Sequence, residues 1–148
     1  MREIKFRVYD KKLKKYMTLK EYQDLHAIEV ETDGTLILSP RYRFMDSMMI
    51  DTDAFDVQEF TGLHDKNGKE IYEGDILPFT MYDLKTEYYY IVFRNGEFEA
   101  INKQDTNFIW RSAWKESTVI GNIYENPDFL KGADNIEWSR WTFWQSRF

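Results

Sequence analysis

Oxygen-bearing side chains gather with glycines at residues 61–75, in the block TGLHDKNGKEIYEGD. The pattern Asp65-x-Asn67-Gly68-x-Glu70 has a passing likeness to a calcium loop. A calcium loop of the EF-hand type needs about twelve residues, a terminal bidentate glutamate and flanking helices, whereas strands are predicted to flank this block. Tight turns demand the same residue types, so we interpret the block as structural. Its predicted core residues are Leu63, Ile71, Tyr72 and Ile76.

Other side chains that could do chemistry are scattered. An acidic run consists of Asp51, Asp53, Asp56 and Glu59. Carboxylates suit hard cations, but a solvated acidic loop is the favoured interpretation. His26 and His64 are the only histidines, and nothing in their spacing selects partners for a metal. A catalytic triad assembled across the sequence stays open, although no G-x-S-x-G turn is present. We therefore expect no enzyme, no catalytic or metal-binding residues and no cofactor.

Composition narrows the classes of partner. The chain has 20 basic and 26 acidic residues, a formal net charge of −6, no cysteine, and 43% hydrophobic residues. That apolar content predicts a folded chain, and the acidic balance argues against general binding to nucleic acid, though not against a local basic patch. No run of about 18 apolar residues is present to cross a membrane, and the charged N-terminus does not read as a signal peptide. We expect a cytoplasmic protein.

Hydrophobic periodicity predicts a mainly β fold. Residues 3–9 alternate between apolar and polar positions, as in a half-buried strand. Two strands at 27–30 and 35–38 flank a Gly-containing turn, and a short helix is predicted over 19–26 from its capping residues. Further strands are predicted at 57–64, 69–72, 88–93, 98–101 and 117–122. Short strands with Gly-containing turns favour a small antiparallel barrel with extra hairpins.

The sequence pattern of the C-terminal residues 131–148 differs from that of the preceding strands. Asp134 with Glu137 resembles a helix N-cap and its reciprocal acid. Aromatic residues then recur at helical spacing, which predicts a short C-terminal helix with one aromatic face. Such a face has to be covered by its own barrel, a second copy or another protein. The candidate interface residues are Trp138, Trp141, Trp144 and Phe148.

Three blocks in the same order resemble the YopX family of phage and prophage proteins. They are REIKFRVYDKKLKKYM at the start, QEFTGLHDKNGKEIYEGDI in the centre and VIGNIYENP at 119–127. The resemblance implies a mostly β structure containing a small SH3-like barrel and a phage or prophage setting. It implies no established activity, cofactor or catalytic residue. His64 and residues 131–148 depart from the family pattern.

These observations predict a β domain at residues 1–130 and an aromatic helical tail at 131–148. The predicted function is a phage or prophage accessory protein acting as a non-catalytic protein-interaction module. We expect a homo-oligomer with an unidentified host or phage protein as partner, and no membrane association. The alternative is a nucleic-acid-associated accessory protein that stacks bases on a barrel face. The stacking candidates would be Tyr82, Tyr88, Tyr89 and Tyr90, near Lys85.

Overall fold

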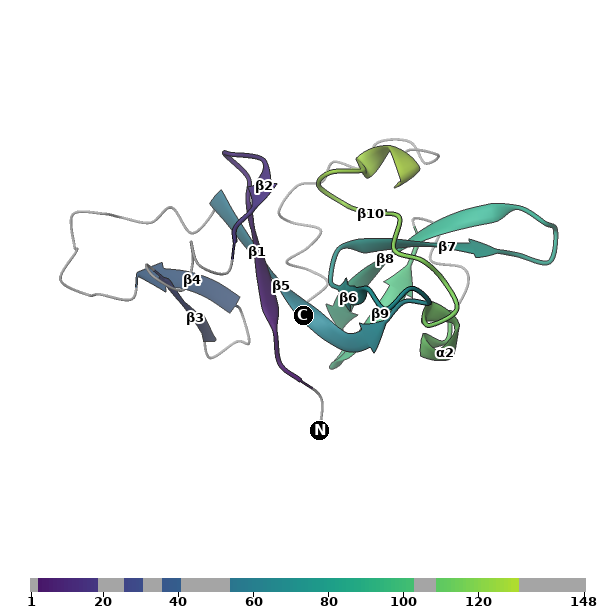
Figure 1. The fold of residues 1–148 in the computed structure, drawn as a ribbon, viewed down its shortest axis with the longest axis horizontal. Helices are drawn as coiled ribbons and strands as arrows, with labels where there is room; N and C mark the ends of the chain where they lie inside the picture. The colour runs from purple at the N-terminus through teal and green to yellow at the C-terminus, as the bar shows by residue number, and fades with distance from the viewer. Residues whose placement is uncertain (1–2, 19–25, 31–35, 41–53, 103–108, 131–148) are drawn as a thin grey trace. The chain divides into compact units, whose positions relative to one another are not determined.

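The computed structural model describes residues 3–18, 26–30, 36–40, 54–102 and 109–130, and it divides into two compact units. The N-terminal unit comprises residues 5–59, and the C-terminal unit comprises residues 60–148 with 1–4. The described residues form antiparallel β-sheets with little helix (Figure 1). The predicted mainly β fold is confirmed.

The N-terminal unit is built on β1 (Phe6–Asp10), which pairs with β2 (Lys15–Tyr16) and with the first half of β5 (Phe55–His64). All pairs are antiparallel, with Tyr9 opposite Tyr16 and Val8 opposite Val57. Successive side chains of a strand point to opposite faces, and Val8 and Val57 lie on the face that forms one small core. This explains the two-residue hydrophobic period of residues 3–9. The apolar residues packed against that pair are Phe6, Met17 and Phe55.

A second hairpin of this unit joins β3 (His26–Val30) to β4 (Leu36–Pro40). Its antiparallel register runs from His26 opposite Pro40 to Val30 opposite Leu36, so the predicted hairpin is confirmed. The helix predicted over 19–26 lies outside the described residues, except for His26, which begins β3.

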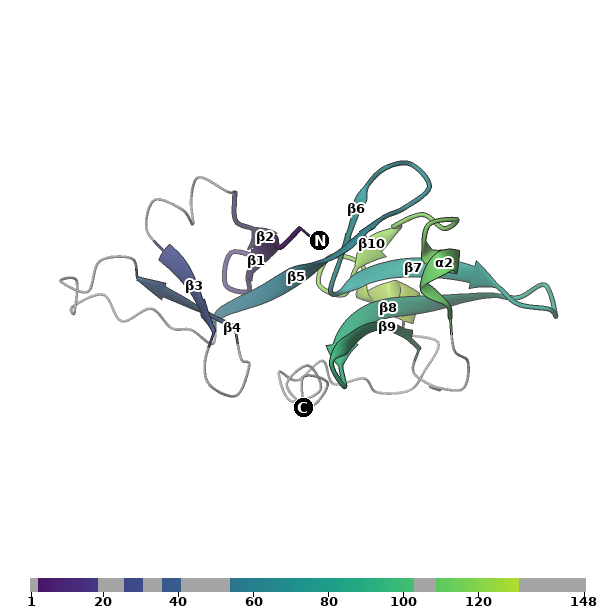
Figure 2. The same cartoon turned by 90° about the horizontal axis from the view of Figure 1, so that it is seen from below.

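The C-terminal unit contains a sheet with the strand order β10–β7–β8–β9. Its strands are β7 (Asp75–Thr80), β8 (Thr86–Arg94), β9 (Glu97–Ile101) and β10 (Gly121–Asn122), and β6 (Glu70–Tyr72) pairs with the second half of β5. The long β8 curls together with its neighbours (Figure 2). The strand predicted at 117–122 is reduced to two residues. Ser117 instead closes a turn, donating its N–H to Trp114 O at 3.1 Å.

Both faces of β7 and β8 are apolar, which explains their dense hydrophobic sequence. Leu77 and Ile91 face a cluster that includes Trp114, from the short α2 (Arg111–Trp114). Ile76 and Val92 face the opposite cluster, which the 3-10 helix η2 (Pro127–Leu130) covers with Leu130. Closure of the sheet into an SH3-like barrel stays a prediction, as does the boundary between 130 and 131. The predicted C-terminal helix lies outside the described residues.

Candidate interaction surface

The central block TGLHDKNGKEIYEGD is held together internally. Asp65 is only 5% exposed. Its Oδ1 accepts hydrogen bonds from the backbone N–H groups of Asn67 and Lys69, both at 2.9 Å, and its Oδ2 accepts one from Val119 at 2.9 Å. Gly68 supplies the positive φ, 82°, that this tight turn needs. The carboxylate therefore ties the turn to the segment before β10.

The electrostatics of Asp65 fit this structural role. Burial raises the pKa of its carboxyl, but the three backbone N–H donors and the nearby charge of Lys69 outweigh burial. The pKa is held below its usual value, because donors that satisfy the anion favour the charged form. Both carboxylate oxygens already accept hydrogen bonds from the protein, so the block is a structural turn rather than a ligand loop.

The other sequence candidates are not brought together. Among the described residues, no group of three or more His, Asp or Glu side chains is placed to hold a metal ion. Asp51 and Asp53 of the acidic run lie outside the described residues, while Asp56 and Glu59 lie on β5. His64 is exposed at the end of the same strand.

The proposed base-stacking face is largely occupied by the core. Tyr89 and Tyr90 are buried in the two opposite clusters of the C-terminal unit. Tyr88 packs against Phe129 of η2, with ring centroids 5.1 Å apart. These three rings therefore serve the fold, and Tyr82 is the one member of the tyrosine set that is fully exposed.

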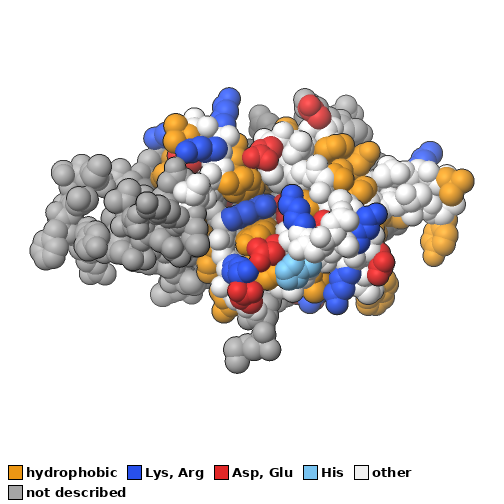
Figure 3. Space-filling model, viewed as in Figure 1, with side chains coloured by type: hydrophobic (Ala, Val, Ile, Leu, Met, Phe, Trp, Pro, Cys, Tyr) orange, Lys and Arg blue, Asp and Glu red, His pale blue; other side chains and the backbone are white. Residues whose placement is uncertain are grey.

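Tyr82 lies at the tip of the β7–β8 hairpin, between Thr80, the last residue of β7, and Thr86, the first residue of β8. Two backbone hydrogen bonds close the tip, from Met81 N to Lys85 O and from Leu84 N to Met81 O, both at 2.9 Å. Leu84 is 85% exposed, so two large apolar side chains stand at the end of the hairpin. Figure 3 shows hydrophobic side chains projecting at this end of the molecule.

Leu84 also has an unfavourable backbone conformation. Its φ is +63°, in the left-handed region that costs an L-residue roughly 1–2 kcal/mol. The neighbouring β8–β9 turn meets the same demand with Asn95 and Gly96, at φ of 53° and 80°, which are the residue types that tolerate it. The exposed side chain of Leu84 adds almost no burial to the fold, while its backbone conformation has a cost that glycine would not have.

The tip carries no net charge to attract a charged partner. Asp83 and Lys85 lie beside each other, with Lys85 Nζ 3.9 Å from Asp83 Oδ2. Asp83 Oδ1 also accepts a hydrogen bond from the Lys85 backbone N–H at 3.1 Å. We define this surface, the tip surface, by Tyr82, Asp83, Leu84 and Lys85. It presents two apolar side chains around a compensated ion pair.

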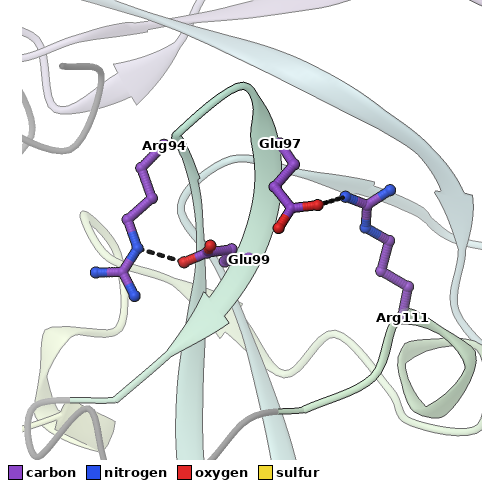
Figure 4. A network of polar contacts seen from close by, with 4 residues as sticks. All are labelled: Arg94, Glu97, Glu99 and Arg111. Atoms are coloured by element: carbon purple, nitrogen blue, oxygen red, sulfur yellow. Dashed lines mark hydrogen bonds and ion pairs between the residues drawn. The ribbon is translucent and has the colours of Figure 1, made fainter.

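Ion pairs at the opposite end of β8 brace the sheet. Figure 4 shows Arg94 of β8 paired with Glu99 of β9, and Arg111 of α2 paired with Glu97 at 2.8 Å. The second pair links α2 to β9, and α2 in turn places Trp114 in the core. The two ion pairs therefore join neighbouring elements of the C-terminal unit.

Sequence reasoning missed the tip surface in part. Tyr82 belongs to the predicted base-stacking set, whereas Leu84 belongs to no site predicted from the sequence. A usable signal was the segment MYDLK, which reverses the chain without glycine, asparagine or proline. The predicted interface residues Trp138, Trp141, Trp144 and Phe148 lie outside the described residues.

This geometry defines a mainly β protein of two small units, in whose described residues no group of acidic and histidine side chains is placed to hold a metal ion. The YopX protein family model matches residues 5–131, and the chain belongs to the YopX family. No curated protein matches it in sequence.

Two solved structures are similar to this chain. The protein EF1440 from Enterococcus faecalis is 25% identical, with a TM-score of 0.55 over 88% of this chain and 99% of that chain. The protein yopX from Bacillus subtilis is 19% identical, with a TM-score of 0.51 over 88% of this chain and 97% of that chain. The second likeness concerns the fold alone. None of the helices in the described part of the chain has the length and apolarity of a membrane span.

Proposed function

We propose that this protein is a non-catalytic protein-interaction module that docks through the tip surface of the β7–β8 hairpin. The observation that carries the proposal is Leu84, an exposed leucine kept at a φ of +63°. A side chain held there at a cost in folding free energy indicates a use outside the fold. Burying a Leu or an aromatic side chain contributes about 1.5–3 kcal/mol, enough to make Leu84 and Tyr82 interface anchors.

The partner is a protein with an apolar pocket. The Asp83–Lys85 pair compensates the charge of the tip surface, so neither a polyanion nor a charged membrane gains from contact with it. The two apolar side chains alone are smaller than a stable interface requires, since such interfaces bury about 1,200–2,000 Å² in total. They therefore act as the central contact of a larger surface.

The same proposal covers the cellular location, the phage or prophage origin and the self-association of the protein. The module acts in the cytoplasm as a phage or prophage accessory protein and is not an enzyme. It self-associates through the tail residues Trp138, Trp141, Trp144 and Phe148, whose helical spacing would place them on one apolar face. Membership of the YopX family supports the phage setting.

Affinity capture from a host lysate, with nuclease added to every sample, tests the proposal. The test variant replaces Tyr82 and Leu84 by serine, and the matched control replaces the exposed Ile4 and Trp110 by serine. A protein retained by wild type and control, and at least about tenfold depleted with the test variant, supports docking at the tip. Equal retention by all three proteins refutes it.

A further inference from the structure

The turn between β1 and β2 concentrates positive charge in an acidic protein. Residues 11–15 read Lys-Lys-Leu-Lys-Lys, and the whole chain carries a net charge of −6. Lys12, Lys14 and Lys15 are exposed, and Leu13 among them is 66% exposed. Figure 3 shows basic side chains gathered over this turn. We call residues 11–15 the basic turn.

The basic turn has a fixed backbone. Asp10 is buried at its base, and its Oδ1 accepts hydrogen bonds from the backbone N–H groups of Lys12, at 2.8 Å, and Leu13, at 2.9 Å. Lys11 N donates to Ala54 O at 2.8 Å, which ties the turn to the start of β5. An ordered loop loses little backbone entropy on binding, so its lysines form a preorganised set.

One lysine occupies a position that a lysine does not favour. Lys14 has a φ of +54°, where asparagine or glycine would be less strained. The β8–β9 turn uses asparagine and glycine at such positions. As with Leu84, the conformational cost indicates a use for this side chain beyond the fold, and for a lysine that use is its charge.

A planar cation lies next to the basic turn on the same hairpin. The guanidinium carbon of Arg7 is 4.6 Å from the centroid of the Tyr16 ring. Both groups are fixed by Gln58, which is 1% exposed: its Oε1 accepts hydrogen bonds from Arg7 Nε, at 2.8 Å, and from Tyr16 OH, at 3.0 Å. Gln58 Nε2 in turn donates a hydrogen bond to Asp56 Oδ2 at 3.2 Å, so an acidic side chain also faces this network.

We propose that the basic turn, with Arg7 and Tyr16, binds single-stranded nucleic acid. Lysine ammonium groups would neutralise successive phosphates, and the Arg7–Tyr16 pair would offer a flat cationic surface to unpaired bases. A membrane has no flat group to use that surface, and Leu13 alone is a weak apolar anchor for a lipid layer. Because the chain as a whole carries a net charge of −6, attraction to phosphates depends on this local positive charge and is sensitive to salt.

The test measures fluorescence anisotropy of a labelled oligothymidylate of roughly 20 nucleotides, with salt varied from about 50 to 200 mM. One variant replaces Lys12, Lys14 and Lys15 by glutamine. The matched control replaces the exposed Lys66, Lys69 and Lys115 by glutamine and removes the same total charge. All six positions are exposed, and thermal melting of both variants checks that each keeps the fold.

We expect the turn variant to bind at least about tenfold more weakly, with a salt slope shallower by about 2, because each phosphate contact to a single strand contributes about 0.7. The control variant is expected to keep both the affinity and the slope of the wild type. Equal losses in the two variants, or no binding by the wild type, would overturn the proposal. So would binding of the wild type to phosphatidylserine vesicles without binding to the oligonucleotide.

An Arg7→Lys variant tests the stacking part separately. It keeps the positive charge and removes the planar guanidinium. The affinity is expected to fall severalfold at an unchanged salt slope. Unchanged affinity would contradict a stacking role for Arg7 and leave a purely electrostatic turn, which is not the site proposed.

Discussion

Replacing Leu84 by glycine is expected to stabilise the protein while it weakens docking. The left-handed φ of Leu84 costs roughly 1–2 kcal/mol, and glycine removes that cost. Glycine adds about 0.5–1 kcal/mol of unfolded-chain entropy. The side chain is 85% exposed, so almost no burial is lost. The net gain in the free energy of unfolding is about 0.5 kcal/mol, equivalent to a rise in Tm of about 2 °C.

Urea unfolding followed by tryptophan fluorescence measures this change in the free energy of unfolding of the C-terminal unit, which carries the hairpin. All five tryptophans lie within residues 60–148, the part of the sequence that carries the hairpin. The matched variant Leu84→Ala keeps a Cβ and therefore keeps the backbone cost, so its stability is expected to equal that of the wild type. Gly96→Ala, at a φ of +80° with nothing within 4 Å of the new Cβ, is expected to lose about 1 kcal/mol.

The refuting result is a clear loss of stability in Leu84→Gly with none in Leu84→Ala. That pattern would show that the backbone of the tip is not strained, and the inference that Leu84 is kept for a partner would lose its basis. In the capture assay both variants are expected to lose the partner, because both lack the apolar side chain.

Two further changes concern the turns of the C-terminal unit. Gly121→Ala is expected to lower the free energy of unfolding in urea by more than about 3 kcal/mol, because its Cβ would lie 2.3 Å from Asn126 Oδ1 in a crowded turn. In Gly68→Ala the new Cβ has open space around it, so the expected loss is only about 1 kcal/mol and comes from the positive φ. Asp65→Asn is expected to lose about 2 kcal/mol at pH 7, since one amide oxygen cannot accept from donors on both sides. The pKa of Asp65 in the folded protein is below the unfolded value of 3.8, so its ionisation stabilises the fold above that pH. This stabilisation is lost as the pH falls through the folded pKa. The assignment would be contradicted if, over this pH range, the free energy of unfolding of the wild type did not fall relative to that of Asp65→Asn.

Local patterns in the sequence were sufficient for the strands and the tight turns. Alternation predicted β1, and turn residues predicted the β3–β4 hairpin and the Asp65–Gly68 turn. These features depend on neighbouring residues, so a short window contains the information. The family resemblance also came from contiguous blocks, and the match over residues 5–131 confirms it.

Long-range placement decided what the sequence left open. Tyr89 and Tyr90 are buried on opposite faces because the C-terminal unit covers both faces of β8, and no local pattern distinguishes such rings from exposed ones. The role of Asp65 depends on Val119, a donor far away in the chain. The strained φ values of Leu84 and Lys14 follow from how each hairpin closes, so only the tertiary structure shows that these side chains are kept at a cost in folding free energy.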